Sequence, residues 1–320
     1  MAQQQIPQRL RDVVIPTLSA VGIIGATEAY VVGGTTAASP SQYWDGWLPS
    51  PYFQTNIQTA YDRCQGGRNE VVLVTPESHS RSAALTFNEN MTHVVGMYGP
   101  AYQNQRSRIF HSATLSPLMT VSGQGSVFAN LYFGYGLGNA TDLNLLAVTG
   151  NRNTFKHCHF LAANATPLDE SGFKLIDLQA AETYFDHCYF GGDTVAWSNG
   201  TMINFAASSE PPRVVFEDCM FVMNGDNSGT PTFLKTVAGL GRCTIVFKRC
   251  MFLNLGTTLT LAIDGAGLGN AKMIFDINCT FAGVTDIVAA AKESSVWVGH
   301  GGYTAASLLN NLIATHPDLS

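Results

Sequence analysis

The sequence has little charge and no long apolar run. Only 12% of its 320 residues are charged and 46% are hydrophobic, which suits a large buried interior or a surface partly covered by partners. A net charge of -6 with scattered basic residues argues against nucleic-acid binding. No stretch reaches the roughly 20 apolar residues of a membrane-spanning helix. We therefore expect neither nucleic acid nor a membrane as a partner.

A working export signal is also missing. Residues 1–27 imitate a signal peptide, because Arg9 and Arg11 precede the mostly apolar run Val13–Ala26. However, Pro16 interrupts that run and no clear small-x-small cleavage site follows it. We expect a chain that is made in a cytoplasm, with residues 1–27 as an N-terminal arm.

What the sequence does contain is a repeated motif, Phe-x-x-Cys-x-Phe, whose cysteines are 29 to 31 residues apart. The copies are Phe155–Phe160, Phe185–Phe190, Phe216–Phe221, Phe247–Phe252 and, with one extra residue, Phe275–Phe281. Phe128–Phe133 is a copy without cysteine, and a fainter copy surrounds residues 94–98. A regular period of this length indicates stacked structural repeats.

Each copy predicts two short strands that meet at a corner. Cys219 and Phe221 are two residues apart and share one strand face, as do Val214 and Phe216, whereas the Glu217–Asp218 pair between them is polar. A third strand follows at residues 173–178, 202–205, 233–237 and 259–263.

Three short strands per turn of about 30 residues predict an all-β fold, a right-handed parallel β-helix of about seven coils. A helical solenoid is excluded by the period-2 patterning, and a β-propeller needs about 40 or more residues per blade. We place the β-helix at residues 28–300, with a capping helix at Asn56–Gln65. The tail, residues 301–320, holds a short helix with an apolar face formed by Leu308, Leu309, Leu312 and Ile313.

The start of the repeat region resembles the pectin-lyase-like β-helix proteins. The resemblance rests on Ala29–Gly34, Asp45–Gly46, Asn56–Tyr61, Val71–Pro76 and Val94–Gly99, and it covers roughly residues 28–300. It implies a first strand, a capping helix and a strand ending in proline before the coils. That superfamily includes polysaccharide lyases and hydrolases, phage tailspikes and non-catalytic virion proteins, and the fold does not choose among them.

Candidate acidic residues lie at the predicted corners. Glycoside hydrolysis needs two carboxyl groups about 5 to 9.5 Å apart. The outward carboxylates at equivalent corner positions are Asp186, Glu217, Asp218 and Asp276, and the same ladder contains Lys156, Lys248 and Arg249. We expect these charges to pair with one another, and exposed pairs of this kind contribute only about 0–1 kcal/mol each.

A second polar cluster contains His157, His159, Asp186 and His187. His157 and His187 are one coil apart, close enough to share a metal or to act with Asp186 as an acid–base pair. The cluster lacks a third neutral ligand and matches no fixed motif, so we interpret it as a solvated corner. No Ser/His/Asp triad motif, phosphate loop or dinucleotide fingerprint is present either. We expect no catalytic residue, metal or cofactor.

The repeated cysteines share a strand face with core phenylalanines, so their sulfurs should point inward. Stacked Cβ atoms would lie about 4.8 Å apart, farther than the roughly 3.8 Å of a relaxed disulfide. We therefore expect free thiols that fill core volume.

These observations predict a non-enzymatic structural protein of a bacteriophage virion, a capsid decoration or cement protein, because a virion protein is made in a host cytoplasm yet works outside cells. Its expected partners are the phage major capsid protein or another shell protein, and further copies of itself in a homotrimer. The expected attachment residues are Ile6, Arg9, Arg11, Val13, Val14 and Ile15. The alternatives are a short tailspike depolymerase and a non-catalytic carbohydrate-binding adhesin.

Overall fold

The structure is a computed structural model. It describes residues 18, 23, 26, 28–33, 52–98, 107–111, 116–136, 144–206, 212–226, 228–268, 271–289, 291 and 295–299. The predicted attachment residues and the predicted C-terminal helix lie outside the described residues.

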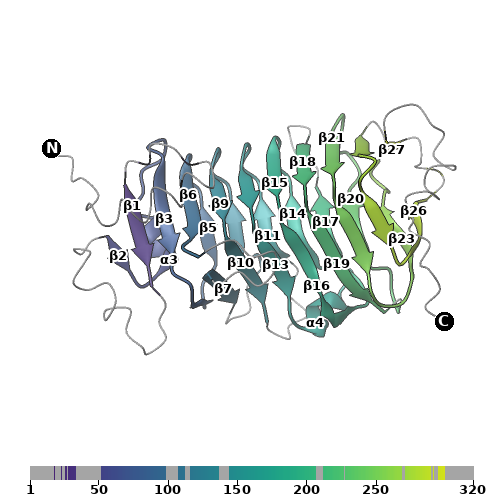
Figure 1. The fold of residues 1–320 in the computed structure, drawn as a ribbon, viewed down its shortest axis with the longest axis horizontal. Coiled ribbons are helices and arrows are strands. Elements are labelled where there is room, and N and C mark those ends of the chain that lie inside the picture. The colour runs from purple at the N-terminus through teal and green to yellow at the C-terminus, as the bar shows by residue number, and fades with distance from the viewer. Residues whose placement is uncertain are drawn as a thin grey trace.

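The chain winds into a right-handed parallel β-helix with three sheets, and the coils follow one another along the long axis (Figure 1). Sheet A consists of β1 (Ala29–Val32), β2 (Phe53–Gln54), β3 (Glu70–Val74), β6 (Thr92–Gly96), β9 (Val127–Ala129), β12 (Thr154–Lys156), β15 (Thr183–Asp186), β18 (Arg213–Glu217), β21 (Thr244–Lys248), β24 (Lys272–Phe275) and β27 (Val296–Val298). Sheet B consists of β4 (Ser78–Arg81), β7 (Ser107–His111), β10 (Leu131–Tyr135), β13 (His159–Ala162), β16 (Tyr189–Trp197), β19 (Met220–Gly225), β22 (Met251–Asn254) and β25 (Thr280–Ala282). Sheet C consists of β5 (Leu85–Phe87), β8 (Met119–Val121), β11 (Asn144–Val148), β14 (Lys174–Leu178), β17 (Thr201–Phe205), β20 (Thr232–Thr236), β23 (Leu259–Asp264) and β26 (Val284–Val288).

Sheets B and C have 8 strands each, which makes eight complete coils in the described residues, one more than the repeat predicts. Neighbouring strands are parallel and in register, so that Phe185 lies beside Phe155 on one side and Phe216 on the other. The predicted third strands correspond to β14, β17, β20 and β23 of sheet C.

The two phenylalanines of the motif form two columns inside the coil. Phe185 and Phe216 stack with ring centroids 4.7 Å apart, and Phe221 and Phe252 stack at 4.5 Å. The columns also touch each other, since Phe216 meets Phe221 edge-to-face at 5.7 Å. Burying each ring contributes about 1.5–3 kcal/mol, with roughly 0.5–1.5 kcal/mol more per aromatic pair. The repeated motif is therefore the core of the stack.

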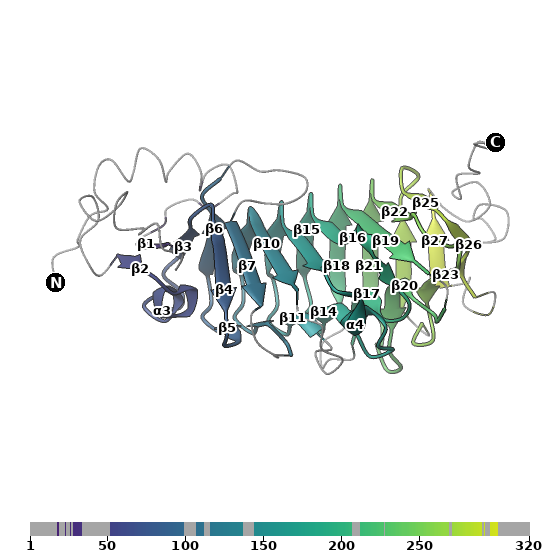
Figure 2. The ribbon, with the colours of Figure 1, turned by 90° about the horizontal axis from the view of Figure 1, so that it is seen from below.

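The helix α3 (Ile57–Tyr61) lies beside the first coil (Figure 2) and is shorter than the predicted Asn56–Gln65. Asn56 is its N-cap, and the Asn56 side chain accepts hydrogen bonds from two backbone amides of the first turn. Tyr61 is buried and packs edge-to-face on Phe87 at 4.7 Å. The helix thus covers the end of the main core, as predicted. A second helix, α4 (Ala165–Leu168), contacts β13 and β16.

A second, smaller core lies on the outer face of sheet A. Leu18 and Ile23 are 3% and 5% exposed and pack with Val31, Leu73 and Val95. Both residues fall within the predicted arm, so these two positions belong to the folded body. Among the described helices none is long and apolar enough to cross a membrane.

Candidate functional site

A single residue makes each corner between sheet A and sheet B. In five successive coils it has a left-handed backbone conformation, with φ between 50° and 56°, at Asn130, His157, His187, Asp218 and Arg249. This conformation turns the chain sharply, which is why the alternation in the motif breaks there. The predicted corner is confirmed: the side chain of Asn130 is buried, and the other four polar side chains form one column along the outside of the stack.

The residue after each of the last four of these corners is a cysteine of the motif, and its side chain points inward. All seven cysteines are free and buried. The Sγ atoms of Cys158, Cys188 and Cys219 lie 3.3 to 3.5 Å from the backbone oxygens of Phe128, Phe155 and Phe185 in the preceding coil. The same contact recurs from Cys250 to Phe216 and from Cys279 to Phe247.

These thiols serve as hydrogen-bond donors as well as core filling. Each thiol donates to a backbone oxygen in the buried corner, and one such hydrogen bond contributes about 0.5–1.5 kcal/mol to stability. Burial raises the pKa of Cys158 and of Cys219, which keeps these sulfurs protonated. A protonated, buried thiol is neither a nucleophile nor a metal ligand. The cysteine column is therefore structural, as predicted, and the hydrogen bond is a feature that the sequence analysis missed.

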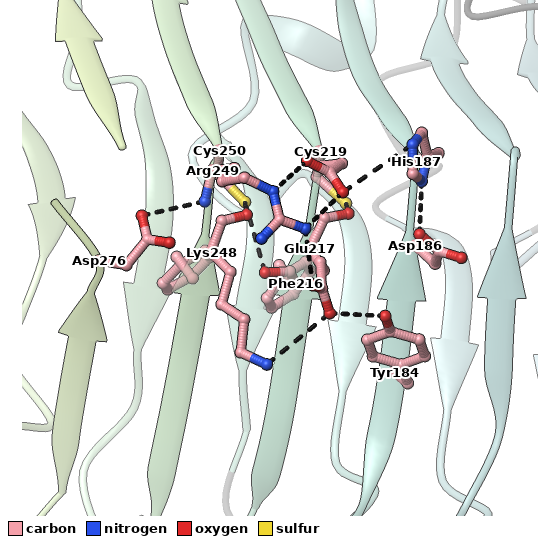
Figure 3. A network of polar contacts seen from close by, with 12 residues as sticks. Tyr184, Asp186, His187, Phe216, Glu217, Cys219, Lys248, Arg249, Cys250 and Asp276 are labelled. Atoms are coloured by element: carbon pink, nitrogen blue, oxygen red, sulfur yellow. Dashed lines mark hydrogen bonds and ion pairs between the residues drawn. The ribbon is translucent and has the colours of Figure 1, made fainter. Parts of the chain in front are cut away.

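Outside the corner, Arg249 bridges two carboxylates of the preceding coil (Figure 3). Its Nε and Nη2 atoms lie 2.7 Å from the two carboxylate oxygens of Asp218, and Nη2 is also 2.7 Å from Oε1 of Glu217. Tyr184 donates a hydrogen bond of 2.7 Å to Oε2 of Glu217, and Lys248 lies 3.8 Å from the same oxygen. The charge pairing expected from the sequence is confirmed at these residues.

This network keeps both carboxyl groups ionised. Hydrogen bonds from Tyr184 and Arg249 lower the pKa of Glu217, and the hydrogen bond from Arg249 lowers that of Asp218. A general acid for glycoside cleavage needs the opposite, a pKa raised toward neutral pH. Glu217 and Asp218 are thus suited to holding adjacent coils together and unsuited to donating a proton.

A histidine pair lies one coil further toward the N-terminus. Nδ1 of His187 is 2.5 Å from Oδ1 of Asp186, and the rings of His157 and His187 have centroids 5.1 Å apart. Burial lowers the pKa of His157. Lys156 lies 3.3 Å from the other oxygen of Asp186.

Asp186, His187 and Asp218 are the residues here that could hold a metal ion, since one ligand atom from each lies within 4.8 Å of the others. Two cations already occupy the carboxylates, because Lys156 pairs with Asp186 and Arg249 takes both oxygens of Asp218. A divalent ion would have to displace them and would be repelled by their charges. The structure favours an ion-paired corner over a metal centre.

His159 does not belong to this cluster, which corrects the grouping made from the sequence. It lies on β13 of sheet B, is 3% exposed, and is flanked edge-to-face by Tyr132 and Tyr189 at 4.8 and 4.7 Å. Its Nε2 atom lies 3.2 Å from the backbone oxygen of Gly191. Burial lowers the pKa of His159 to about 4, so its ring is neutral and acts as part of an aromatic stack.

A polar row on the outer face of sheet C is a further feature that the sequence analysis missed. In register it contains Asp177, Asn204, Lys235 and Asp264. Asn204 is 1% exposed and donates a 2.6 Å hydrogen bond to Asp177, while Lys235 lies 3.2 Å from Asp264. The signal was available: Asp177, Asn204 and Lys235 are polar residues within predicted third strands, and Asp264 directly follows the last of them.

A pocket of about 360 Å³ opens beside this row. It is lined by Ser171, Gly200, Gly229, Thr230, Pro231, Thr232, Lys235, Leu259, Thr260, Leu261 and Asp264. Hydroxyl groups from several coils, one ion pair and a few apolar side chains suit a small neutral molecule that carries many hydroxyls.

No protein-family model matches the sequence, and no curated protein matches it. Similarity to solved structures is found instead. The structure of pectate lyase Pel9A superposes with a TM-score of 0.52 at 13% identity, covering 87% of this chain and 76% of that one. This similarity supports the fold, a right-handed parallel β-helix. A pectin methylesterase from Aspergillus niger gives a TM-score of 0.43 at 12% identity, covering 91% and 98% of the two chains. A Geobacillus virus E2 protein, ORF18, gives 0.32 at 11% identity, covering 77% of this chain and 54% of that one. At these sequence identities the similarity to the three structures concerns architecture alone.

Proposed function

We propose that this chain is a non-enzymatic structural protein of a bacteriophage particle, a capsid decoration or cement protein assembled in the host cytoplasm. The observation that carries the proposal is that the outward carboxylates at the corner are already paired. Arg249 donates hydrogen bonds to both Glu217 and Asp218. Groups that would serve an acid–base mechanism are used here to join one coil to the next.

The cysteines support the same proposal. Seven free, buried thiols suit a chain that folds in a reducing cytoplasm, where disulfides are rare. A regular rod with a dense core also suits a protein that must stay folded on a particle. Each stacked repeat is stabilised by its contacts with the neighbouring repeats.

For attachment we propose the segment that precedes Leu18. Leu18 and Ile23 already pack on sheet A, so a deletion that includes them would disturb the fold as well as the arm. The proposed contacts to the shell protein are Ile6, Arg9, Arg11, Val13, Val14 and Ile15.

The test uses particles that lack the chain, to which purified protein is added before sedimentation. The full chain should sediment with the particles, and a chain without residues 1–15 should stay in the supernatant with an unchanged melting temperature. A Glu217→Gln control should sediment like the full chain. Undiminished sedimentation of the shortened chain would refute the attachment segment, and failure of the full chain to bind any particle would refute the particle role.

A second candidate function, glycan binding without catalysis, is favoured by the pocket on sheet C. Calorimetric titration with fragments of host surface glycan should show saturable binding that Thr232→Val weakens and Thr86→Val does not. New reducing ends in the incubated glycan would instead indicate cleavage.

A further inference from the structure

The outer face of sheet A carries an apolar stripe along the second half of the rod. It consists of Tyr184, Val215, Val246, Ile274 and Trp297, which are successive partners in the strand register. In the part of the chain that the structure describes, the first four are half-buried and Trp297 is 53% exposed. Lys272 lies over the Trp297 ring, with Nζ 5.8 Å from its centroid.

The same face is covered at its N-terminal end. There Leu18 and Ile23 close over Val31, Leu73 and Val95 and form the second core. The fold therefore already buries one part of this face under apolar side chains. In register, the row of the stripe continues from Tyr184 through Thr154 to Val127, which packs against this second core. The row of Val95 continues instead into Lys156 at the edge of the stripe.

Charged residues border the stripe on both sides. On one side Lys156 pairs with Asp186 at 3.3 Å, followed by Glu217 and Lys248. On the other side Glu182 lies 2.6 Å from both Arg152 and Arg213. An apolar centre with a paired polar rim is the usual anatomy of a protein–protein interface.

The charges of these border residues also bear on which partner can bind the stripe. The whole chain carries a net charge of -6, so copies repel one another at most orientations. The border residues named above are four basic and three acidic side chains, so the negative charge of the chain is not concentrated on this face and does not oppose the approach of two copies.

The spacing of the stripe points to the same partner. Side chains repeat once per coil, at the roughly 4.8 Å separation of neighbouring strands. A second copy has the same period, so two stripes laid together stay matched over their whole length. A globular partner without that period would match at one or two positions only.

We propose that the sheet A stripe binds a second copy of this chain, stripe against stripe. The inference does not rest on the proposed particle role and holds for the isolated protein. It predicts that the free chain self-associates in solution, with Trp297 and the β-branched residues of β18, β21 and β24 at the centre of the contact.

Sedimentation velocity on the full chain at several concentrations tests the proposal. The native chain should sediment as a dimer or larger species. Val246→Glu should weaken association by at least about tenfold, because it would place an unpaired carboxylate in the contact. Thr86→Glu, an exposed position on sheet C, is the matched control and should associate like the native chain.

Trp297→Ala separates loss of the contact from loss of the fold, because it removes an exposed ring without adding a charge. It should also shift the equilibrium toward monomer, with a melting temperature close to that of the native chain. A native chain that stays monomeric at every concentration, or a Val246→Glu chain that is folded and fully associated, would overturn the proposal. Particle binding is measured separately, so either idea can fail alone.

Discussion

The Sγ atom of Cys219 lies 3.5 Å from the backbone oxygen of Phe185 in the preceding coil and donates a hydrogen bond to it. Both groups are buried, and the same relationship recurs in the coils on either side. At the equivalent position, the oxygen of Phe247 also accepts a hydrogen bond from the backbone N–H of Asp276, so the thiol of Cys279 adds a second hydrogen bond to an oxygen that is already paired. The stability of the corner therefore depends on hydrogen bonding as well as on packing.

We predict that Cys219→Val destabilises the fold by about 0.5–1.5 kcal/mol, the usual net contribution of one hydrogen bond, since valine fills the space of the thiol but cannot donate to Phe185. Chemical denaturation of the two proteins measures the difference. Cys219→Ala should be less stable still, because it adds a cavity to the lost donor. A valine chain as stable as the native one would show that the thiol is packing alone.

The burial of the cysteines predicts their reactivity. In the native protein none of the seven thiols should react with a soluble disulfide reagent within minutes, since all are buried. After unfolding in guanidinium, all seven should react. Rapid reaction of any of the five motif cysteines in the folded chain, identified by peptide mapping, would contradict the inward orientation of the column.

The left-handed corner predicts a sequence preference at His157, whose φ is 50°. His157→Asn should be neutral or stabilising, because asparagine tolerates this conformation. His157→Val should lose about 1–2 kcal/mol, since a branched side chain clashes there. Lys156→Val is the control one residue away, on a regular strand. It should lose only its partly exposed ion pair with Asp186, about 0–1 kcal/mol. Equal losses for both valine variants in thermal unfolding would argue against a strained corner.

Acid should weaken the corner through Glu217 and Asp218. Both have a pKa in the folded state below their ordinary values of 4.5 and 3.8. A carboxyl group of this kind stabilises the fold fully above its unfolded pKa, and that stabilisation is lost as the pH falls through the folded pKa. The free energy of unfolding should therefore decline as the pH drops below 4.5.

The control for this pH dependence is Arg249→Ala, which removes the main partner of both carboxylates. Its stability should decline less over the same pH range, although it starts lower. The difference should be small, because these groups are partly exposed and solvent screens the ion pairs. Identical acid profiles for the two chains would mean that other carboxylates control the transition.

Much of this architecture is predictable from the sequence because the coils repeat. The spacing of Cys158, Cys188 and Cys219 gives the length of one coil, and the polar pair Glu217–Asp218 marks the corner. Stacking equivalent positions then places Arg249 beside Asp218, which the structure confirms. Periodicity suffices here because each residue meets its counterpart in the next coil.

The surroundings of a residue are not predictable from its own motif where they come from other parts of the chain. His159 points outward, but Tyr132 and Tyr189 in the neighbouring coils bury it. Aligning that position through all the copies would have shown a mostly apolar column. Leu18 and Ile23 follow no period, so only the folded chain shows that they cover sheet A.

The copy number of this chain in purified phage particles tests the proposed role most directly. Quantitative mass spectrometry of particles from the producing host, with imaging to locate the chain, would provide it. The structural role predicts many copies at regular positions on the capsid shell, without cleavage of host glycans. A chain missing from particles, or a few copies at the tail tip that cleave glycans, would contradict it.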